Sequence, residues 1–261
     1  MGDFKHKKRF GQNFLNNKKV LIDIIDSIDV QEDDLVIEIG PGQGALTKYL
    51  KLYNCNLICY EIDVELKKYL DSFEDDKTRI IYKNFLNSDI QADIKDIKYN
   101  KLYIIANLPY YITTPIIEKI IKDKIDVQEM TLMVQKEVAN RFSASPGNKE
   151  YGSITVYLSA YFDVSLLFDV NRNNFTPVPN VDSSIIKFVK NNKYLSINNM
   201  DVFNKLLKDS FFMKRKNIKN NLHNYDIKLI ERVLSKYDLS LSDRAENMPL
   251  DAFIDIANEI S

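Results

Sequence analysis

The sequence predicts an α/β fold in which a doubly wound, mostly parallel sheet precedes a small all-helical C-terminal domain. Short apolar runs alternate with helical patterns up to about residue 125, an order typical of parallel strands connected through helices. A glycine-rich loop, Gly40-Pro41-Gly42-Gln43-Gly44, directly follows the first apolar run. After the polar, Asn-rich segment 191–199 the pattern is helical only. We therefore expect one domain over residues 1–190 and a second over residues 191–261.

The first half of the chain alternates strands and helices. Asn16 and Asn17 can cap a helix whose apolar face includes residues 20–28. The pattern then predicts strands at residues 35–39, 57–61 and 79–83, and helices at residues 45–53 and 64–73. Glu61 ends the second strand, and Asn84 follows the third.

The next part of the chain predicts a fourth strand at residues 102–106, a helix that starts near Pro115, a strand at residues 130–134 and a helix at residues 135–141. Residues 154–162 and 181–189 are interpreted as further strands. Because few helices separate these later strands, we expect them to run antiparallel at one edge of the sheet.

Composition limits the kinds of partner and site. The 261 residues carry a formal net charge of −1, so RNA binding would have to use local basic patches. Cys55 and Cys59 are the only cysteines and are expected to be buried thiols, and a zinc site would need about four ligands, so no metal is expected. No apolar run approaches the ~18 residues of a membrane span, and the basic start lacks a signal-peptide core. We expect a cytoplasmic protein without a membrane partner.

The glycine loop predicts a nucleoside site. Glycines let the backbone approach a ligand closely, and Glu61 lies 21 residues after Gly40, where its carboxylate can accept hydrogen bonds from both ribose hydroxyls. The spacing from Gly42 to Gly44 is shorter than in the dinucleotide fingerprint, and no Lys follows as in a P-loop. The loop therefore fits an adenosine that carries an amino-acid tail, and the alternative is a structural turn.

A second candidate site is the tetrapeptide Asn107-Leu108-Pro109-Tyr110, which follows the fourth strand. The Asn107 amide oxygen and the Leu108 carbonyl can face one point because Pro109 restricts the chain. Tyr110 offers a ring on which a base can stack. Two acceptors and a ring suit the exocyclic amine of a nucleobase, whereas the alternative is a strand end closed by a proline turn.

Two single residues complete the candidate site. Asn84 stands where an adenine edge can be read, with Asp89 as a nearby alternative, and either can equally be a solvated loop residue. Phe175 opens the stiff loop Phe175-Thr176-Pro177-Val178-Pro179 and can close over a base opposite Tyr110; the alternative is that its ring belongs to the core.

Basic residues cluster at the two ends of the chain, at Lys5, Lys7, Lys8 and Arg9 and at Lys214, Arg215, Lys216 and Lys219. They can neutralise phosphates and give salt-dependent RNA binding. The alternative is that each cluster is a solvated face.

Taken together, these motifs resemble the ribosomal RNA adenine dimethyltransferases, most closely the small-subunit (KsgA) branch, over nearly the whole chain. The resemblance rests on the segments Phe10-Gly11-Gln12-Asn13-Phe14-Leu15, Glu38-Ile39-Gly40-Pro41-Gly42-Gln43-Gly44-Ala45-Leu46-Thr47, Asn107-Leu108-Pro109-Tyr110-Tyr111-Ile112, Met133-Val134-Gln135-Lys136-Glu137-Val138-Ala139, Tyr151-Gly152, residues 175–183, Arg215-Lys216-Asn217 and Arg244-Ala245-Glu246.

The resemblance implies a Rossmann-like methyltransferase domain over residues 1–190 and a helical RNA-binding domain over residues 191–261, with S-adenosylmethionine as the methyl donor. The implied donor contacts are Asn13, Leu15, Gly40, Gly42, Glu61, Asn84 and Asn107. The implied catalytic positions are Asn107, Leu108, Pro109, Tyr110 and Phe175. The family usually has Asp where Asn84 stands; Asn is still an acceptor but carries no charge.

The implied substrate is a pair of adjacent adenines in the 3′-terminal hairpin of small-subunit (16S) rRNA within the pre-30S particle. The protein would act as a monomer in small-subunit biogenesis. No general base is required if Asn107 and the Leu108 carbonyl hold both N–H bonds of an adenine amine while stacking orients it for in-line attack on the sulfonium methyl. The target base must first leave its stack.

Two alternative functions follow from the same motifs. One is a large-subunit rRNA adenine methyltransferase of the macrolide-resistance type, which Leu108, Arg215-Lys216-Asn217 and Arg244-Ala245-Glu246 disfavour. The other is a non-catalytic RNA-binding assembly factor, which the intact tetrapeptide at residues 107–110 disfavours.

Overall fold

The computed structural model describes residues 13–107 and 110–261, which divide into two compact units. The first contains the described residues up to Ala139 together with Leu166–Val189, and the second contains Asn140–Ser165 and Lys190–Ser261. The division near residue 190 lies next to the predicted domain boundary. Residues 140–165, however, group with the helical unit, whereas the sequence placed them in the first domain.

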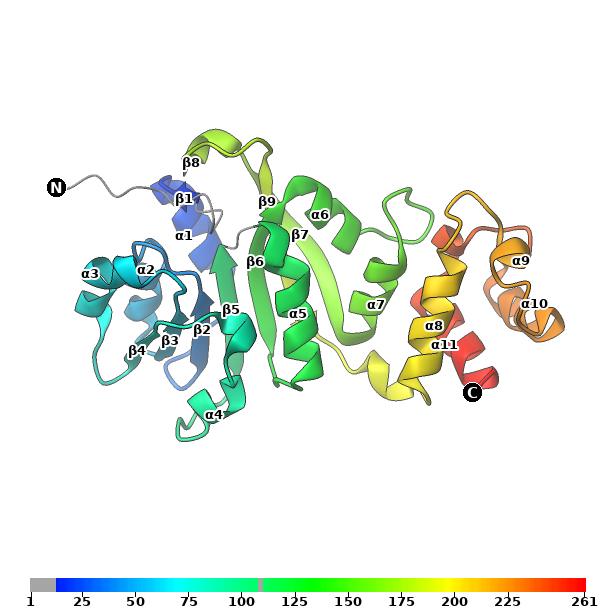
Figure 1. The fold of residues 1–261 in the computed structure, drawn as a ribbon, viewed down its shortest axis with the longest axis horizontal. Coiled ribbons are helices and arrows are strands. Elements are labelled where there is room, and N and C mark those ends of the chain that lie inside the picture. The colour runs from blue at the N-terminus through cyan, green and yellow to red at the C-terminus, as the bar shows by residue number, and fades with distance from the viewer. Residues whose placement is uncertain (1–12, 108–109) are drawn as a thin grey trace. The chain divides into compact units, whose positions relative to one another are not determined.

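Within the described residues, seven strands form one sheet in the order β4-β3-β2-β5-β6-β9-β7 (Figure 1). Their bounds are β2 Leu35–Ile39, β3 Asn56–Tyr60, β4 Thr78–Ile81, β5 Leu102–Asn107, β6 Glu129–Gln135, β7 Phe162–Val170 and β9 Ser183–Lys190. Strands β2 to β6 pair in parallel, and β9 pairs antiparallel with β6. The predicted parallel sheet with an antiparallel edge is confirmed.

The order of the strands reverses at β2, which has β3 on one side and β5 on the other. Every residue of β2 is buried, which explains why the strand reads as a continuous apolar run apart from Glu38. The register pairs Ile39 of β2 with Tyr60 of β3 and with Ala106 of β5, so these three strands end at the same edge. Ligands of doubly wound sheets bind outside the carboxyl ends of the strands at this kind of reversal.

The helices of the first unit are mostly short. The α-helices are α1 Lys18–Asp26, α2 Thr47–Leu50, α3 Lys67–Leu70, α4 Ile90–Ile94, α5 Thr113–Lys122 and α6 Lys136–Phe142, the last of which crosses the division between the units. The 3₁₀ turns are η2 Lys51–Tyr53, η3 Val64–Leu66, η4 Asp71–Phe73, η5 Phe85–Asn87, η6 Tyr110–Ile112 and η7 Arg172–Asn174. The helices predicted at residues 45–53 and 64–73 are thus mixtures of α and 3₁₀ turns, whereas Asn17 caps α1 as predicted.

A small antiparallel pair stands apart from the main sheet and joins two distant segments. Strand β1 (Phe14–Leu15) pairs with β8 (Phe175–Thr176), so that Leu15 lies opposite Phe175. Asn16 Nδ2 donates to Thr176 Oγ1 at 2.6 Å, and Asn17 Nδ2 donates to Asn174 Oδ1 at 2.7 Å. The N-terminal motif and the proline-rich loop therefore form one substructure.

The second unit is built around helices α7 Ser153–Tyr161, α8 Met200–Ser210, α9 Ile218–Asn221, α10 Ile227–Leu234 and α11 Leu250–Glu259, with 3₁₀ turns η8 Lys193–Ser196, η9 Ser235–Tyr237 and η10 Ala245–Asn247. Its core contains the apolar faces that the sequence indicated, including Phe203, Ile230 and Phe253, all fully buried. Across the described part of the chain, none of the helices combines the length and apolarity that a bilayer span requires.

The strand predicted at residues 154–162 is wrong, because these residues form helix α7. Their β-branched residues favour a strand locally, but this preference depends strongly on context. Gly152 N–H donates to the Thr155 hydroxyl at the start of the helix, and Val156 and Ala160, one turn apart, are both buried in the core of the second unit. Packing of that face overrides the local preference. The strand in this region is instead β7, which the sequence analysis did not identify.

Candidate functional site

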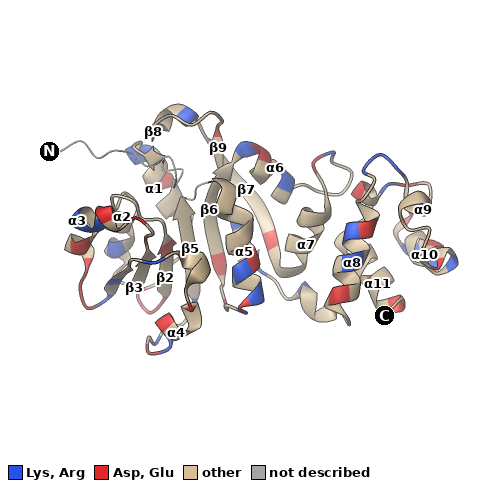
Figure 2. Cartoon of the chain, in the orientation of Figure 1, with Lys and Arg blue, Asp and Glu red and all other residues tan. Residues whose placement is uncertain are grey.

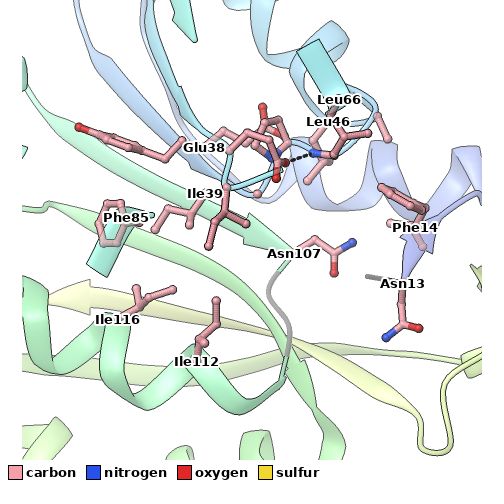
Figure 3. A pocket seen from close by; sticks show the side chains of 18 of the residues that line it. Asn13, Phe14, Glu38, Ile39, Leu46, Leu66, Phe85, Asn107, Ile112 and Ile116 are labelled. Atoms are coloured by element: carbon pink, nitrogen blue, oxygen red, sulfur yellow. Dashed lines mark hydrogen bonds between the residues drawn. The ribbon is translucent and has the colours of Figure 1, made fainter. Parts of the chain in front are cut away.

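A cavity of about 260 Å³ lies at the carboxyl ends of β2, β3, β4 and β5 (Figure 3). Its lining includes residues that the sequence analysis singled out from six separate segments: Asn13, Leu15, Gly40, Gly42, Glu61, Asn84, Asn107 and Phe175. All of the predicted donor contacts therefore border one space. Their individual roles remain predictions.

Glu61, at the end of β3, is held by the backbone. Its Oε2 accepts a hydrogen bond from Gly42 N–H at 3.1 Å, and its Oε1 accepts one from Asp63 N–H at 2.8 Å. Each carboxylate oxygen keeps acceptor capacity for a further donor. Burial raises the pKa of Glu61, which is only 4% exposed. The result is an oriented pair of acceptors on the cavity wall.

Glu38 of β2 is a second buried carboxyl on the lining, and the sequence analysis gave it no role. Its Oε2 accepts hydrogen bonds from the Thr47 hydroxyl at 2.7 Å and the Cys59 thiol at 3.6 Å. Burial raises its pKa to about 7. Both cysteines are free and buried, as expected. The sequence feature that could have revealed Glu38 is that it is a charged residue in an otherwise apolar strand.

The glycine loop allows close packing on the cavity floor. Gly42 has a φ of +62°, and a Cβ at this position would lie 2.8 Å from the ring of Phe14 on β1. Gly40 has a φ of +72°, and its N–H donates to the Tyr60 carbonyl at 2.9 Å. Phe14 thus covers the loop, a contact that the sequence gave no means of finding.

The two ends of the cavity differ in chemistry. Figure 3 shows Phe85, Ile112 and Ile116 around one end, and Asn107 and Asn13 near the other. The Phe85 ring is held edge-on to Tyr60, with ring centroids 5.3 Å apart. An elongated ligand with a flat apolar group at one end and polar groups at the other would match this arrangement.

The tetrapeptide that begins at Asn107 is only partly described. Asn107 is the last residue of β5, pairs with Met133 of β6 and borders the cavity. Leu108 and Pro109 lie outside the described residues, and Tyr110 begins η6. Tyr111, which was not among the predicted site residues, also borders the cavity and is 66% exposed.

Phe175 combines the two roles that the sequence left open. Its side chain is 2% exposed and packs within the core of the first unit, yet it also borders the cavity. A base could meet this ring only from inside the cavity. Stacking by Phe175 therefore remains a prediction.

The second unit carries a basic loop, defined here as residues 211–217 between α8 and α9 (Figure 2). It contains Lys214, Arg215 and Lys216, and Phe212 beside them is 78% exposed. Lys214 Nζ donates to the Lys149 carbonyl at 2.7 Å, which fixes the loop to a neighbouring turn of the same unit. The N-terminal basic cluster lies outside the described residues. In the described part of the chain, no group of three or more His, Cys, Asp or Glu could hold a metal ion.

Comparisons with known proteins agree with this geometry. The model of the family "Ribosomal RNA adenine dimethylase" matches residues 3–261. The chain is 40% identical over 259 residues to ribosomal RNA small subunit methyltransferase A of Fusobacterium nucleatum. This alignment covers 97% of each of the two chains. It is 39% identical over 268 residues to the protein of the same name from Streptococcus pyogenes, with 98% of this chain and 92% of that protein covered.

Two solved structures are similar over nearly their whole length. A dimethyladenosine transferase from Plasmodium falciparum matches with a TM-score of 0.75 and 26% identity, covering 93% of this chain and 95% of that one. The 23S rRNA methyltransferase ErmE matches with a TM-score of 0.75 and 21% identity, covering 95% and 99%. The second likeness concerns the fold alone.

Proposed function

The chain belongs to the ribosomal RNA adenine dimethylase family, and we propose that it transfers methyl groups from S-adenosylmethionine to the N6 amines of two adjacent adenines in the 3′-terminal hairpin of 16S rRNA. The observation that carries the proposal is the family match, which spans residues 3–261. The cavity supports it, because it brings together Gly40, Glu61 and Asn107 from three neighbouring strand ends.

The residues on the cavity wall fit the methyl donor. Glu61 offers oriented oxygens for two ribose hydroxyls, and the apolar end around Phe85 suits a purine. S-adenosylmethionine supplies a methyl group on a positively charged sulfur. Glu61 is a buried carboxyl, and Lys83, the one Lys or Arg on the described lining, is exposed. The wall thus favours a ligand that brings positive charge.

The amine of the target adenine would be positioned by Asn107. Its amide oxygen can accept one N–H bond, and the Leu108 carbonyl, by sequence, is the partner for the other. Holding both N–H groups favours a more tetrahedral nitrogen, whose lone pair is less delocalised into the ring. Tyr110 and Phe175 are the proposed stacking residues. Positioning of this kind can lower a barrier by several kcal/mol.

The RNA would be bound through its phosphates. The basic loop of the second unit places three Lys or Arg residues in a row, and exposed Phe212 adds an aromatic ring for an unstacked base. We propose that the substrate is the rRNA of the pre-30S particle, and that the protein acts as a monomer in the cytoplasm.

The test mixes purified protein with labelled S-adenosylmethionine and small subunits isolated from cells that lack the activity. Digestion of the rRNA and mass spectrometry should reveal two N6,N6-dimethyladenosines in the 3′-terminal hairpin. At saturating donor, the Asn107→Ala variant should give at least about a hundredfold less product. Methylation of 23S rRNA instead, or no dimethyladenosine at all, would contradict the proposal.

A further inference from the structure

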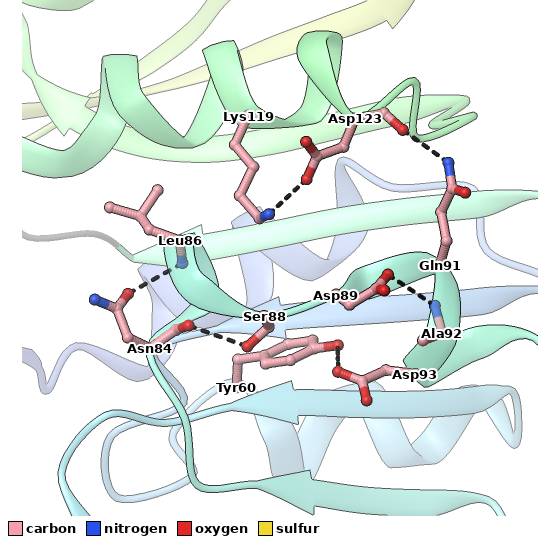
Figure 4. A network of polar contacts seen from close by, with 10 residues as sticks. All are labelled: Tyr60, Asn84, Leu86, Ser88, Asp89, Gln91, Ala92, Asp93, Lys119 and Asp123. Carbon is pink, nitrogen blue, oxygen red and sulfur yellow. Dashed lines mark hydrogen bonds and ion pairs between the residues drawn. The ribbon is translucent and has the colours of Figure 1, made fainter.

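Asn84 occupies a fixed position between β4 and the apolar end of the cavity. It is the N-cap residue of η5, and its Oδ1 accepts a hydrogen bond from Leu86 N–H at 3.0 Å (Figure 4). Asn84 also borders the cavity, next to Phe85. A residue whose side chain caps a turn is therefore part of the wall near the proposed purine position.

The backbone of Asn84 is held as well. Its carbonyl accepts hydrogen bonds from Asn87 N–H at 3.0 Å and from the Ser88 hydroxyl at 3.0 Å. Ser88 is buried, so the contact is shielded from water. These bonds leave Asn84 little freedom to turn without losing its cap.

The cap determines which end of the amide faces away from the turn. Leu86 N–H is a donor, so the amide atom that meets it must be the oxygen. The amide nitrogen is then on the opposite branch, and Figure 4 shows it pointing away from Leu86. Within the described residues no hydrogen-bond partner of Nδ2 is present. The group left for a ligand is a donor of hydrogen bonds.

We propose that Asn84 presents N–H donors to the purine of the methyl donor, so that this cavity has no preference for a 6-amino purine over a 6-oxo purine. The inference rests on the proposed function. An adenine amine donates and gains nothing from another donor, whereas a 6-oxo group accepts. Packing against Phe85 does not distinguish the two bases.

An aspartate at this position would behave differently. One carboxylate oxygen could keep the cap on Leu86 N–H, and the other could accept from the adenine amine. Asp and Asn are equally good caps, so the turn should be retained. A charge-assisted hydrogen bond of this kind changes affinity by about tenfold or more.

The test measures binding of S-adenosylhomocysteine and S-inosylhomocysteine by isothermal titration calorimetry. The wild-type chain should not bind the adenosyl compound more than about threefold more tightly than the inosyl compound. Asn84→Asp should prefer the adenosyl compound by more than about tenfold. Asn84→Ser keeps a capping oxygen but has no amide, and it should discriminate as little as the wild type.

A wild-type preference for the adenosyl compound above about tenfold would overturn the inference, because the amide oxygen would then face the base. If circular dichroism shows that Asn84→Asp does not fold, the ratio of the two Kd values, measured for the wild type and for Asn84→Ser, still tests the inference. Binding of neither compound to the wild type would count against the proposed function as well. Strong binding with high selectivity would count against this inference alone.

Discussion

Replacing Glu38 by Gln should remove a pH dependence of stability that the wild-type chain carries. In the unfolded chain this carboxyl has its ordinary pKa of 4.5, whereas burial raises the pKa to about 7 in the folded chain. Between these values the folded protein holds a proton that the unfolded chain has released. The free energy of unfolding therefore falls as the pH rises from about 4.5 to about 7.

The size of this effect follows from the raised pKa. Each pKa unit is equivalent to about 1.4 kcal/mol. The difference between a pKa of 4.5 in the unfolded chain and about 7 in the folded chain therefore corresponds to about 3 kcal/mol in the free energy of unfolding. Glu38 is 2% exposed, and solvent screening is therefore small. Gln keeps an oxygen that can accept from the Thr47 hydroxyl, so any loss of that bond should be limited and independent of pH. Glu61 is present in both proteins and its contribution largely cancels.

The assay is urea unfolding of both proteins without ligand between pH 5 and pH 8.5. Far-UV circular dichroism is the suitable signal because the chain has no Trp. The free energy of unfolding of Glu38→Gln, relative to the wild type, should rise by about 2.5 kcal/mol across this range. A difference that stays constant within about 0.5 kcal/mol would refute the argument that Glu38 is buried as a neutral acid.

Three further perturbations test the proposed site. Glu61→Gln should weaken S-adenosylmethionine binding about tenfold to a hundredfold by calorimetry, because an amide nitrogen replaces one acceptor. Gly42→Ala should lower stability in thermal unfolding by about 1–2 kcal/mol for the positive φ, and it should also weaken donor binding because the Phe14 ring must move. Replacing Lys214, Arg215 and Lys216 by Ala should lower the slope of log affinity for rRNA against log salt by about 2.

Matched controls separate these effects from general damage. Asp76→Asn changes an exposed acid that does not border the cavity, and donor affinity should be unchanged. Gly147 has a φ of +85° with nothing within 4 Å of a Cβ, so Gly147→Ala should lose stability but keep donor binding. Lys95→Ala with Lys98→Ala should leave the salt slope unchanged. An equal effect of any test variant and its control would contradict the corresponding assignment.

Polar residues at strand ends were predictable because parallel strands bring their carboxyl ends to one edge. Gly40 and Glu61 follow two such strands and Asn107 ends a third, and all three residues border the cavity. The spacing of Glu61 after the glycine loop was therefore enough to place it, although its hydrogen bonds to Gly42 and Asp63 were not foreseeable.

The apolar walls were not predictable for a simple physical reason. Phe85, Ile112 and Ile116 have the same spacing and composition as core residues, and only the fold shows that they also face a cavity. Phe14 reaches Gly42 through a pairing of β1 with β8 that joins segments about 160 residues apart. Contacts of this range leave no local signal.

The most direct test of the central claim is a crystal structure of the chain with S-adenosylmethionine. The donor should lie in the cavity, with its ribose hydroxyls on the Glu61 carboxylate, its purine against Phe85 and its sulfur toward Asn107. A donor bound elsewhere, or a ribose turned away from Glu61, would contradict the account.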